Sequence, residues 1–159
     1  MAKVWQEPVF DRTQEDVDFA ITKIAEWIAS GTFSEVYDLK GCLNVSDINR
    51  IEGNIAYLSE RLTGLAYPIS VSTKQWDKND LPNEDDIGRI INNVRACVQA
   101  YYQPDNAPSI PQSMASYSDI NAIEKNIDLI KYLIDLMVSS FHKSGTFQSG
   151  STTFLPMRR

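Results

Sequence analysis

The stretch that decides the fold is Ser46-Asp-Ile-Asn-Arg-Ile-Glu-Gly-Asn-Ile55, because the chain repeats it. Residues 118–127 read Ser-Asp-Ile-Asn-Ala-Ile-Glu-Lys-Asn-Ile and match it at eight of ten positions, 72 residues further along. A weaker copy, Asp86 to Val94, lies between the two, and Asp16-Val17 shares only the opening. A segment repeated in this way predicts that the same local structure occurs several times.

Each of the four openings has the residues of a helix N-terminus. A short polar side chain stands three residues before an aspartate in each of them: Thr13, Asn44, Asn83 and Ser116. The first side chain can accept a hydrogen bond from the opening turn, and the aspartate can reach back to the N–H of the cap residue. We predict four helices that begin with capping boxes, or with half-formed boxes, since Asp is shorter than the usual Glu.

Apolar residues follow each opening at alternating spacings of three and four, which is typical of helices that pack side by side. We predict helices near residues 14–30, 45–63, 84–102 and 117–143, in one all-α, bundle-like domain of four main helices over residues 1–159. The same spacing leaves open an intermolecular coiled coil formed by the last helix. The expected seams are Val17, Ala20, Ile24 and Trp27; Ile48, Ile51, Ile55, Leu58 and Leu62; Ile87, Ile90, Val94, Cys97 and Tyr101; and Ile120, Ile123, Ile127, Ile130, Ile134, Met137 and Phe141.

The segments outside the helices are less regular. Gly31 and Gly64 mark two of the expected helix ends. Ile69, Val71 and Thr73 alternate with polar residues, and residues 145–155 carry a second, weak strand pattern. A small β-ribbon beside the bundle is therefore an alternative addition to the helical fold.

The composition argues against several kinds of partner. The 159 residues are 43% hydrophobic and carry a net charge of −6 without a basic cluster, so nucleic acid is a poor partner. The chain has no apolar run long enough for a membrane span or a secretion signal, which predicts synthesis in the cytoplasm and no membrane partner. Cys42 and Cys97 fit neither a disulfide framework nor a zinc motif.

Residue types that carry chemistry are few. His142 is the single histidine, and no nucleophile elbow accompanies it, so a cationic side chain near a helix C-terminus is the simpler interpretation. A di-metal site inside a bundle needs Glu-x-x-His pairs, which the chain lacks. We predict that the protein is not an enzyme and that it has no metal and no cofactor.

Three repeated asparagines flank the predicted seams. Asn54, Asn93 and Asn126 each immediately precede a seam residue. Their amides can bond across helices or to a neighbouring backbone and so fix the register, or they can line a polar binding cleft between the repeats. We favour the structural interpretation, because a duplicated residue more easily keeps a duplicated structural role.

Apolar residues in the two terminal segments are the better functional signal. An N-terminal arm over residues 1–12 and a C-terminal tail over residues 144–159 can close the ends of the bundle. Alternatively they dock on a neighbouring subunit, where the tail can add a strand to a sheet edge. The candidate partner contacts are Trp5, Val9, Phe10, Phe147, Phe154 and Leu155, and the candidate surface-recognition residues are Trp76, Tyr101 and Tyr102.

Several of these segments resemble a family of phage proteins. Residues 39–58, the pattern Trp-x-x-x-Asp-x-Pro at 76–82, and the stretches 11–17, 111–114 and 121–125 are similar to structural and tail-associated proteins from phages and prophages of Gram-positive bacteria. The resemblance covers about residues 10 to 145.

The resemblance implies a non-enzymatic component of a virion, in the tail, tail tip or fibre apparatus, with other virion proteins as partners and a homo-oligomeric state. The family has no assigned catalytic residues. Two alternatives stay open. One is a receptor-binding module of the host-attachment apparatus that uses Trp76, Tyr101 and Tyr102, and the other is an assembly factor or a small enzyme that is absent from finished particles.

Overall fold

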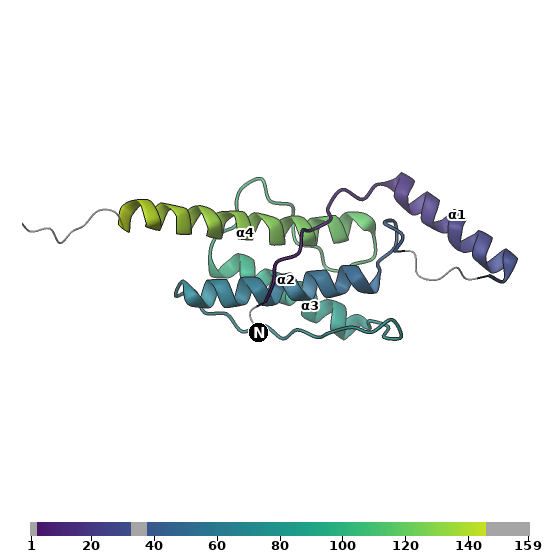
Figure 1. Ribbon diagram of the computed structural model, residues 1–159, viewed down its shortest axis with the longest axis horizontal. Coiled ribbons are helices and arrows are strands. Elements are labelled where there is room, and N and C mark those ends of the chain that lie inside the picture. The colour runs from purple at the N-terminus through teal and green to yellow at the C-terminus, as the bar shows by residue number, and fades with distance from the viewer. Residues whose placement is uncertain (1–2, 33–37, 146–159) are drawn as a thin grey trace, which may run out of the picture.

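The computed structural model describes residues 3–32 and 38–145 and shows a helical, bundle-like fold (Figure 1). Its helices are α1 (Gln14–Ser30), α2 (Val45–Gly64), α3 (Glu84–Ala100) and α4 (Tyr117–Gly145). Every helix boundary lies within two residues of the predicted one, so the all-α fold is confirmed. The described residues contain no strand. One half of the alternative ribbon, Ile69 to Thr73, is extended without a strand partner, and nearly all of the other half lies outside the described residues.

All four helices begin as predicted. In each, the aspartate three residues after the cap accepts a hydrogen bond from the cap residue's backbone N–H: Asp16 from Thr13 at 2.8 Å, Asp47 from Asn44 at 3.0 Å, Asp86 from Asn83 at 3.3 Å and Asp119 from Ser116 at 3.0 Å. The cap side chains of Thr13, Asn83 and Ser116 accept the reciprocal bond from the backbone of the aspartate. Aspartate is therefore long enough to complete the box.

The helix ends follow the sequence less closely. Gly31 ends α1 in the left-handed conformation, with φ 66°, as predicted. In α2 the left-handed residue is Ala66 rather than Gly64, also with φ 66°. The N–H of Tyr67 bonds to the carbonyl of Leu62, and that of Ala66 to the carbonyl of Thr63, which is a Schellman motif. An alanine thus occupies a position that favours glycine.

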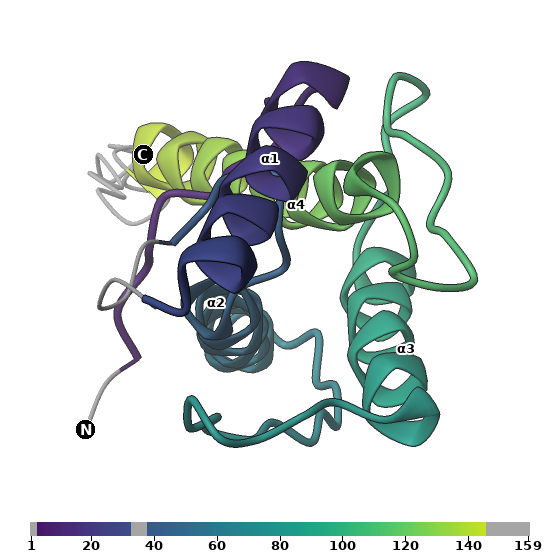
Figure 2. The ribbon, with the colours of Figure 1, turned by 90° about the vertical axis from the view of Figure 1, so that its right-hand side faces the viewer.

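The hydrophobic core is built by α2, α3 and α4, each of which packs against the other two (Figure 2). The predicted seams of these helices supply it, and many of the side chains are completely buried: Ile51, Ile55, Leu58 and Leu62 from α2; Ile90, Val94 and Cys97 from α3; and Ile123, Ile127, Ile130 and Ile134 from α4. The prediction is wrong for the first helix. On its predicted seam Ala20 is the one fully buried residue, and Ile24 is 38% exposed.

Three extended segments are hydrogen-bonded along this three-helix core. We name them strap 1 (residues 3–12), strap 2 (residues 67–82) and strap 3 (residues 102–115). Strap 1 bonds to α2 and α4, strap 2 to α2 and α3, and strap 3 to α3 and α4. Strap 1 crosses the bundle between α4 and α2 in Figure 1. Each pair of core helices thus shares one strap.

The repeated asparagines hold the straps. Asn54 accepts a hydrogen bond from the N–H of Gln6 at 2.9 Å and donates one to its carbonyl at 2.8 Å. Asn93 bonds in the same way to both backbone groups of Ser72. Asn126 donates to the carbonyl of Pro108 at 2.9 Å, where proline has no N–H to return a bond. The prediction that these amides bond to a neighbouring backbone is confirmed.

A second repeated asparagine holds two of the straps again. Asn49 of α2 bonds to the N–H and the carbonyl of Trp76 in strap 2, at 2.8 and 2.9 Å. Asn121 of α4 bonds to the N–H and the carbonyl of Arg12 in strap 1, at 3.3 and 2.9 Å. The corresponding position in α3 is Gly88, which has no side chain to offer strap 3. The sequence repeat therefore becomes an approximate three-fold arrangement of helix and strap.

Candidate interaction surfaces

The polar interior of the molecule is an ion-pair cluster between strap 1, α2 and α4. The guanidinium of Arg12 lies 2.8 Å from the carboxylate of Asp47 and 3.1 Å from that of Glu124. Arg50 approaches the same two carboxylates at 2.6 and 2.7 Å. Two positive and two negative side chains thus neutralise one another. Glu124 also accepts a hydrogen bond from the N–H of Val9 at 2.7 Å, which ties the strap to the cluster.

The same arginine–glutamate pairing recurs between α3 and α2. Arg89 of α3 stands at the repeat position of Arg50, and it bonds to Glu52 of α2 at 2.6 and 3.0 Å. Glu52 in turn stands at the repeat position of Glu124. Glu52 also accepts from the indole N–H of Trp76, at 3.1 Å, as Glu124 accepts from strap 1. At the third contact, between α4 and α3, the two positions are Ala122 and Ile91, so the pair is replaced by apolar side chains.

These carboxylates are saturated with donors. Both oxygens of Asp47, Glu52 and Glu124 accept bonds from arginine, amide or indole groups. Burial raises the pKa of Asp47, but the bonds from Asn44 and Arg50 and the charge of Arg12 outweigh that effect, so its pKa is lowered. The carboxylate stays ionised near neutral pH. The cluster is therefore suited to holding strap 1 in place.

The pKa values of both cysteine thiols are raised, which favours the protonated form. Burial raises the pKa of Cys97 to about 12, and burial together with the charge of Asp47 raises that of Cys42. His142 lies near the end of α4, where the structure describes its backbone only. Among the described residues, no group of three His, Cys, Asp or Glu side chains is placed to hold a metal ion. No helix in the described ranges combines the length and the apolar character that a membrane crossing requires.

Apolar residues line one face of α1, where Val17 is half-buried and the three isoleucines are exposed. We name Val17, Ile21, Ile24 and Ile28 the α1 stripe. The side chain of Ile21 is 61% exposed and that of Ile28 is 67% exposed. In Figure 1, α1 lies at one end of the molecule, apart from the three core helices. None of the other described helices packs on α1 as the core helices pack on one another.

The N-terminus of α1 is nevertheless anchored. Gly41 packs so closely against the backbone of Asp16 and Val17 that a β-carbon at residue 41 would collide with it. Lys40 forms ion pairs with Asp11 at 3.0 Å and Asp16 at 3.5 Å. The loop before α2 thus holds the first turn of α1. The stripe begins beside this anchor and continues away from it along the helix.

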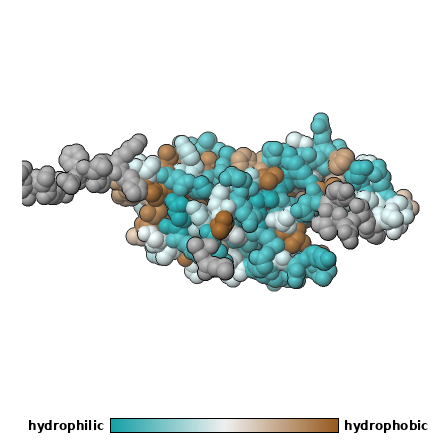
Figure 3. All heavy atoms as spheres, in the orientation of Figure 1, coloured by the Kyte–Doolittle hydropathy of each residue, from teal (hydrophilic) through white to brown (hydrophobic). Residues whose placement is uncertain are grey.

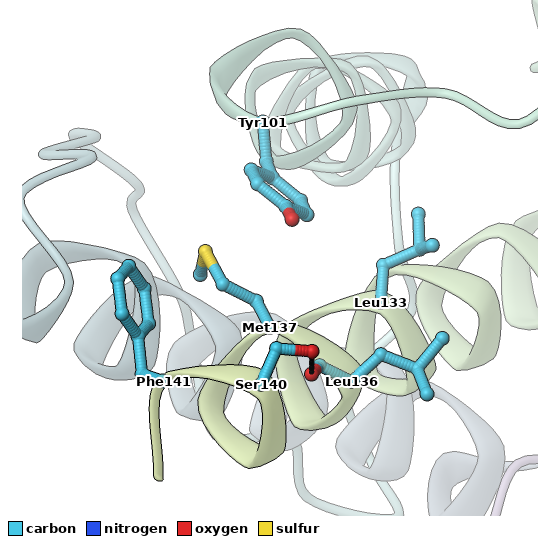
Figure 4. Close-up of a pocket in the computed structure, with 6 residues that line it drawn as sticks. All are labelled: Tyr101, Leu133, Leu136, Met137, Ser140 and Phe141. Atoms are coloured by element: carbon cyan, nitrogen blue, oxygen red, sulfur yellow. Dashed lines mark hydrogen bonds between the residues drawn. The ribbon is translucent and has the colours of Figure 1, made fainter. Parts of the chain in front are cut away.

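A second apolar surface lies at the end of α4. The last turns of α4 extend past α2 and α3 in Figure 1, and apolar side chains gather there in the space-filling view (Figure 3). They border an open pocket of about 590 Å³ (Figure 4). Its lining residues are Tyr101, Leu133, Leu136, Met137, Ser140 and Phe141.

The predicted partner contacts of the N-terminal arm lie on the protein's own bundle. Trp5 is half-buried against the core, with its ring centroid 5.6 Å from that of Tyr57. Phe10 is half-buried below the ammonium of Lys125, which lies 4.3 Å from the ring centroid. Val9 is held through its backbone by Glu124. The C-terminal candidates Phe147, Phe154 and Leu155 lie outside the described residues.

The predicted recognition residues do not form one surface. Trp76 is only 3% exposed, because its ring is part of the core and its N–H is bonded to Glu52. It is therefore wrong as a surface-recognition residue. Tyr102 is 54% exposed. Tyr101 is half-buried, lines the α4 pocket and packs edge-on against Tyr67 at 5.2 Å.

The α1 stripe is the feature that the sequence prediction missed. The sequence does indicate that α1 differs from the other helices, because Asp16-Val17 shares only the opening of the repeat. Aligned on that opening, the positions of Asn49, Glu52 and Asn54 are occupied in α1 by Asp18, Ile21 and Lys23. α1 therefore lacks the side chains that hold a strap.

Comparisons of the chain with known protein families, with curated proteins and with solved structures found no match. The function has to be inferred from the residues and their arrangement.

Proposed function

We propose that this protein is a non-enzymatic structural subunit of a phage-like particle, located in its tail, tail tip or fibre apparatus. The exposed stripe of α1 is the observation that carries an assembly role. Three isoleucines on one face of this helix are exposed to water, and a contiguous apolar surface of this kind supports the proposal of an interaction site. The resemblance of residues 10 to 145 to phage structural proteins supplies the kind of assembly.

The arrangement of charge supports the same proposal. The buried arginines and carboxylates are consumed in fixing strap 1 and strap 2 to the helices. Large apolar side chains are exposed on α1, and others border an open pocket at the end of α4. Burial of Trp76 weakens the alternative of a receptor-binding module, because it removes one of the three aromatic residues on which that alternative depended.

Quantitative mass spectrometry of purified particles from the source strain tests the proposal. We expect several copies of the protein per particle, in a fixed ratio to the major tail or capsid proteins. The lysate after removal of the particles serves as the control. A protein that is abundant in that lysate and absent from intact particles would contradict the structural role and support the assembly-factor alternative.

A further inference from the structure

We propose that the α1 stripe, Val17, Ile21, Ile24 and Ile28, is a homotypic interface that binds the α1 stripe of a second copy of this chain. This inference rests on the proposed structural function and names the surface through which the subunit associates with itself.

The position of α1 in the repeat is the first argument. Straps 2 and 3 lead directly into α3 and α4, the helices that carry the asparagines holding them. Strap 1 is held by Asn54 of α2, but α1 and the loop after it are inserted between that strap and α2. Insertions into a repeated architecture commonly form its binding face. The three-helix core is closed without α1, so α1 is available for another contact.

The register of the stripe is the second argument. Its residues are spaced by four, three and four, which are the spacings of a and d positions in a coiled coil. With Ile21 and Ile28 at a, the d positions are Val17 and Ile24, so every seam residue is β-branched. In coiled coils, Ile at both a and d supports association of like helices and favours trimers and tetramers over dimers.

The flanks of the stripe favour a copy of itself over a charged partner. The charged side chains Glu15, Asp16, Lys23 and Glu26 are at heptad positions remote from the seam, and Lys23 is already paired with Glu26 at 2.7 Å. Asp18 lies beside the seam, at an e position, and accepts a hydrogen bond from the side chain of Gln14 at 2.9 Å. In a parallel pair e positions face g positions of the other helix, and the g positions of α1, Ala20 and Trp27, are uncharged. Ala25, beside the seam, is small enough to let two helices approach. Two copies can therefore meet along the stripe without bringing these charges together across the seam.

The length of α1 limits the affinity. Its 17 residues span about 25 Å, or roughly two heptads, so we expect a weak contact with a dissociation constant in the micromolar range. A weak contact is sufficient for a subunit that is repeated around a symmetric particle, because neighbouring contacts raise the effective concentration.

Sedimentation velocity of the full-length protein over a range of micromolar concentrations tests the inference. We expect concentration-dependent self-association, and we expect Ile24→Asp to weaken it at least tenfold. Phe19→Asp is the matched control, because Phe19 is 57% exposed on the same helix but lies off the stripe. Ile24 is partly exposed and outside the core, so its replacement leaves the bundle folded, which the thermal transition can verify. Association that Ile24→Asp leaves unchanged would overturn the inference.

Cross-linking provides a second readout, because oxidation traps even a weak association. In a Cys42→Ser background, where Cys97 is completely buried, Ile24→Cys should form an intermolecular disulfide on mild oxidation, and Phe19→Cys should not. A chain that stays monomeric and does not cross-link through residue 24 contradicts the homotypic interface. If the same chain is found in particles at fixed stoichiometry, the proposed structural function stands and only its self-association surface is wrong.

Discussion

Each of the four helices has an apolar face, but the bundle helices and α1 differ in what covers that face. Each helix starts with a capping box and places apolar residues at spacings of three and four. In α2, α3 and α4 that face is buried by the other two core helices, whereas α1 leaves Ile21 and Ile28 mostly exposed. Caps and spacing thus specify a helix and its apolar face. They do not specify which segment will cover that face.

The polar residues of the repeat make the difference. Asn54 and Glu52 of α2 reach strap 1 and strap 2, and each of these bonds fixes a segment distant in sequence. α1 has Lys23 and Ile21 at the corresponding positions. A helix that carries these polar residues therefore holds a strap beside it, whereas α1 lacks them and leaves three isoleucines of its apolar face exposed.

The largest effect should come from breaking the buried cluster. Glu124→Ala leaves Arg12 and Arg50 without one of their two acidic partners in a buried setting, so we expect a loss of about 3–5 kcal/mol in the free energy of unfolding. Urea denaturation measures it. Asp128→Ala is the control, because it removes a partly exposed pair with Lys125 and should cost less than about 1 kcal/mol. Equal effects of the two substitutions would contradict a structural role for the cluster.

Release of strap 1 should have the next largest effect. Asn54→Ala removes both bonds to Gln6 and leaves their backbone groups partly buried, so we expect a loss of about 2–3 kcal/mol. The exposed Asn92 of α3 provides the matched control, since Asn92→Ala removes only a surface bond to Arg95. Hydrogen exchange should show faster exchange in residues 3–12 for Asn54→Ala alone. Unchanged exchange in this segment would mean that Asn54 does not hold the strap.

A third substitution separates α1 from the bundle. Gly41→Ala places a methyl group against the backbone of Asp16 and Val17, so the first turn of α1 must shift, at a cost of about 1–2 kcal/mol. We expect hydrogen-exchange protection to fall in α1 and to persist in α2, α3 and α4. Gly53→Ala is the control, because a β-carbon there meets no atom within 4 Å. A collapse of protection throughout the chain would show that α1 and the bundle fold as one unit.

The smallest effect should be a gain in stability at the end of α2. Ala66 holds a left-handed conformation, with φ 66°, that glycine adopts without steric cost. Glycine also has more conformational entropy in the unfolded chain, which reduces this gain. The net effect of Ala66→Gly should be a rise of about 0.5–1 kcal/mol in the free energy of unfolding. Thermal denaturation at matched concentrations can detect this. A lower midpoint for Ala66→Gly would argue against the Schellman geometry at this position.

The local structure of this protein could be predicted from its sequence because local signals determine it. The caps at Thr13, Asn83 and Ser116 and the seams of α2, α3 and α4 depend on residues three or four positions apart. The backbone bonds of Asn54 and Asn93 were predictable in kind, since amides beside a buried seam need partners.

The pairing of distant segments could not be predicted in the same way. Arg50 and Glu124 are 74 residues apart, and no periodic pattern links them. The burial of Trp76 depends on strap 2 lying beside Asn49, which a strand-like alternation does not reveal. The apolar spacing of α1 equals that of a packed helix, so spacing alone does not reveal that α1 lies outside the core.

The anchoring of strap 1 has a consequence for biosynthesis. Arg12 binds Asp47 and Glu124, which follow it by 35 and 112 residues, and Val9 binds a carboxylate 115 residues later. Strap 1 therefore lacks its bonding partners in α4 until that helix has been synthesised. A growing chain can close α1 through its own capping box, but strap 1 waits for α4. Strap 1 is thus synthesised well before the helix that completes its binding site.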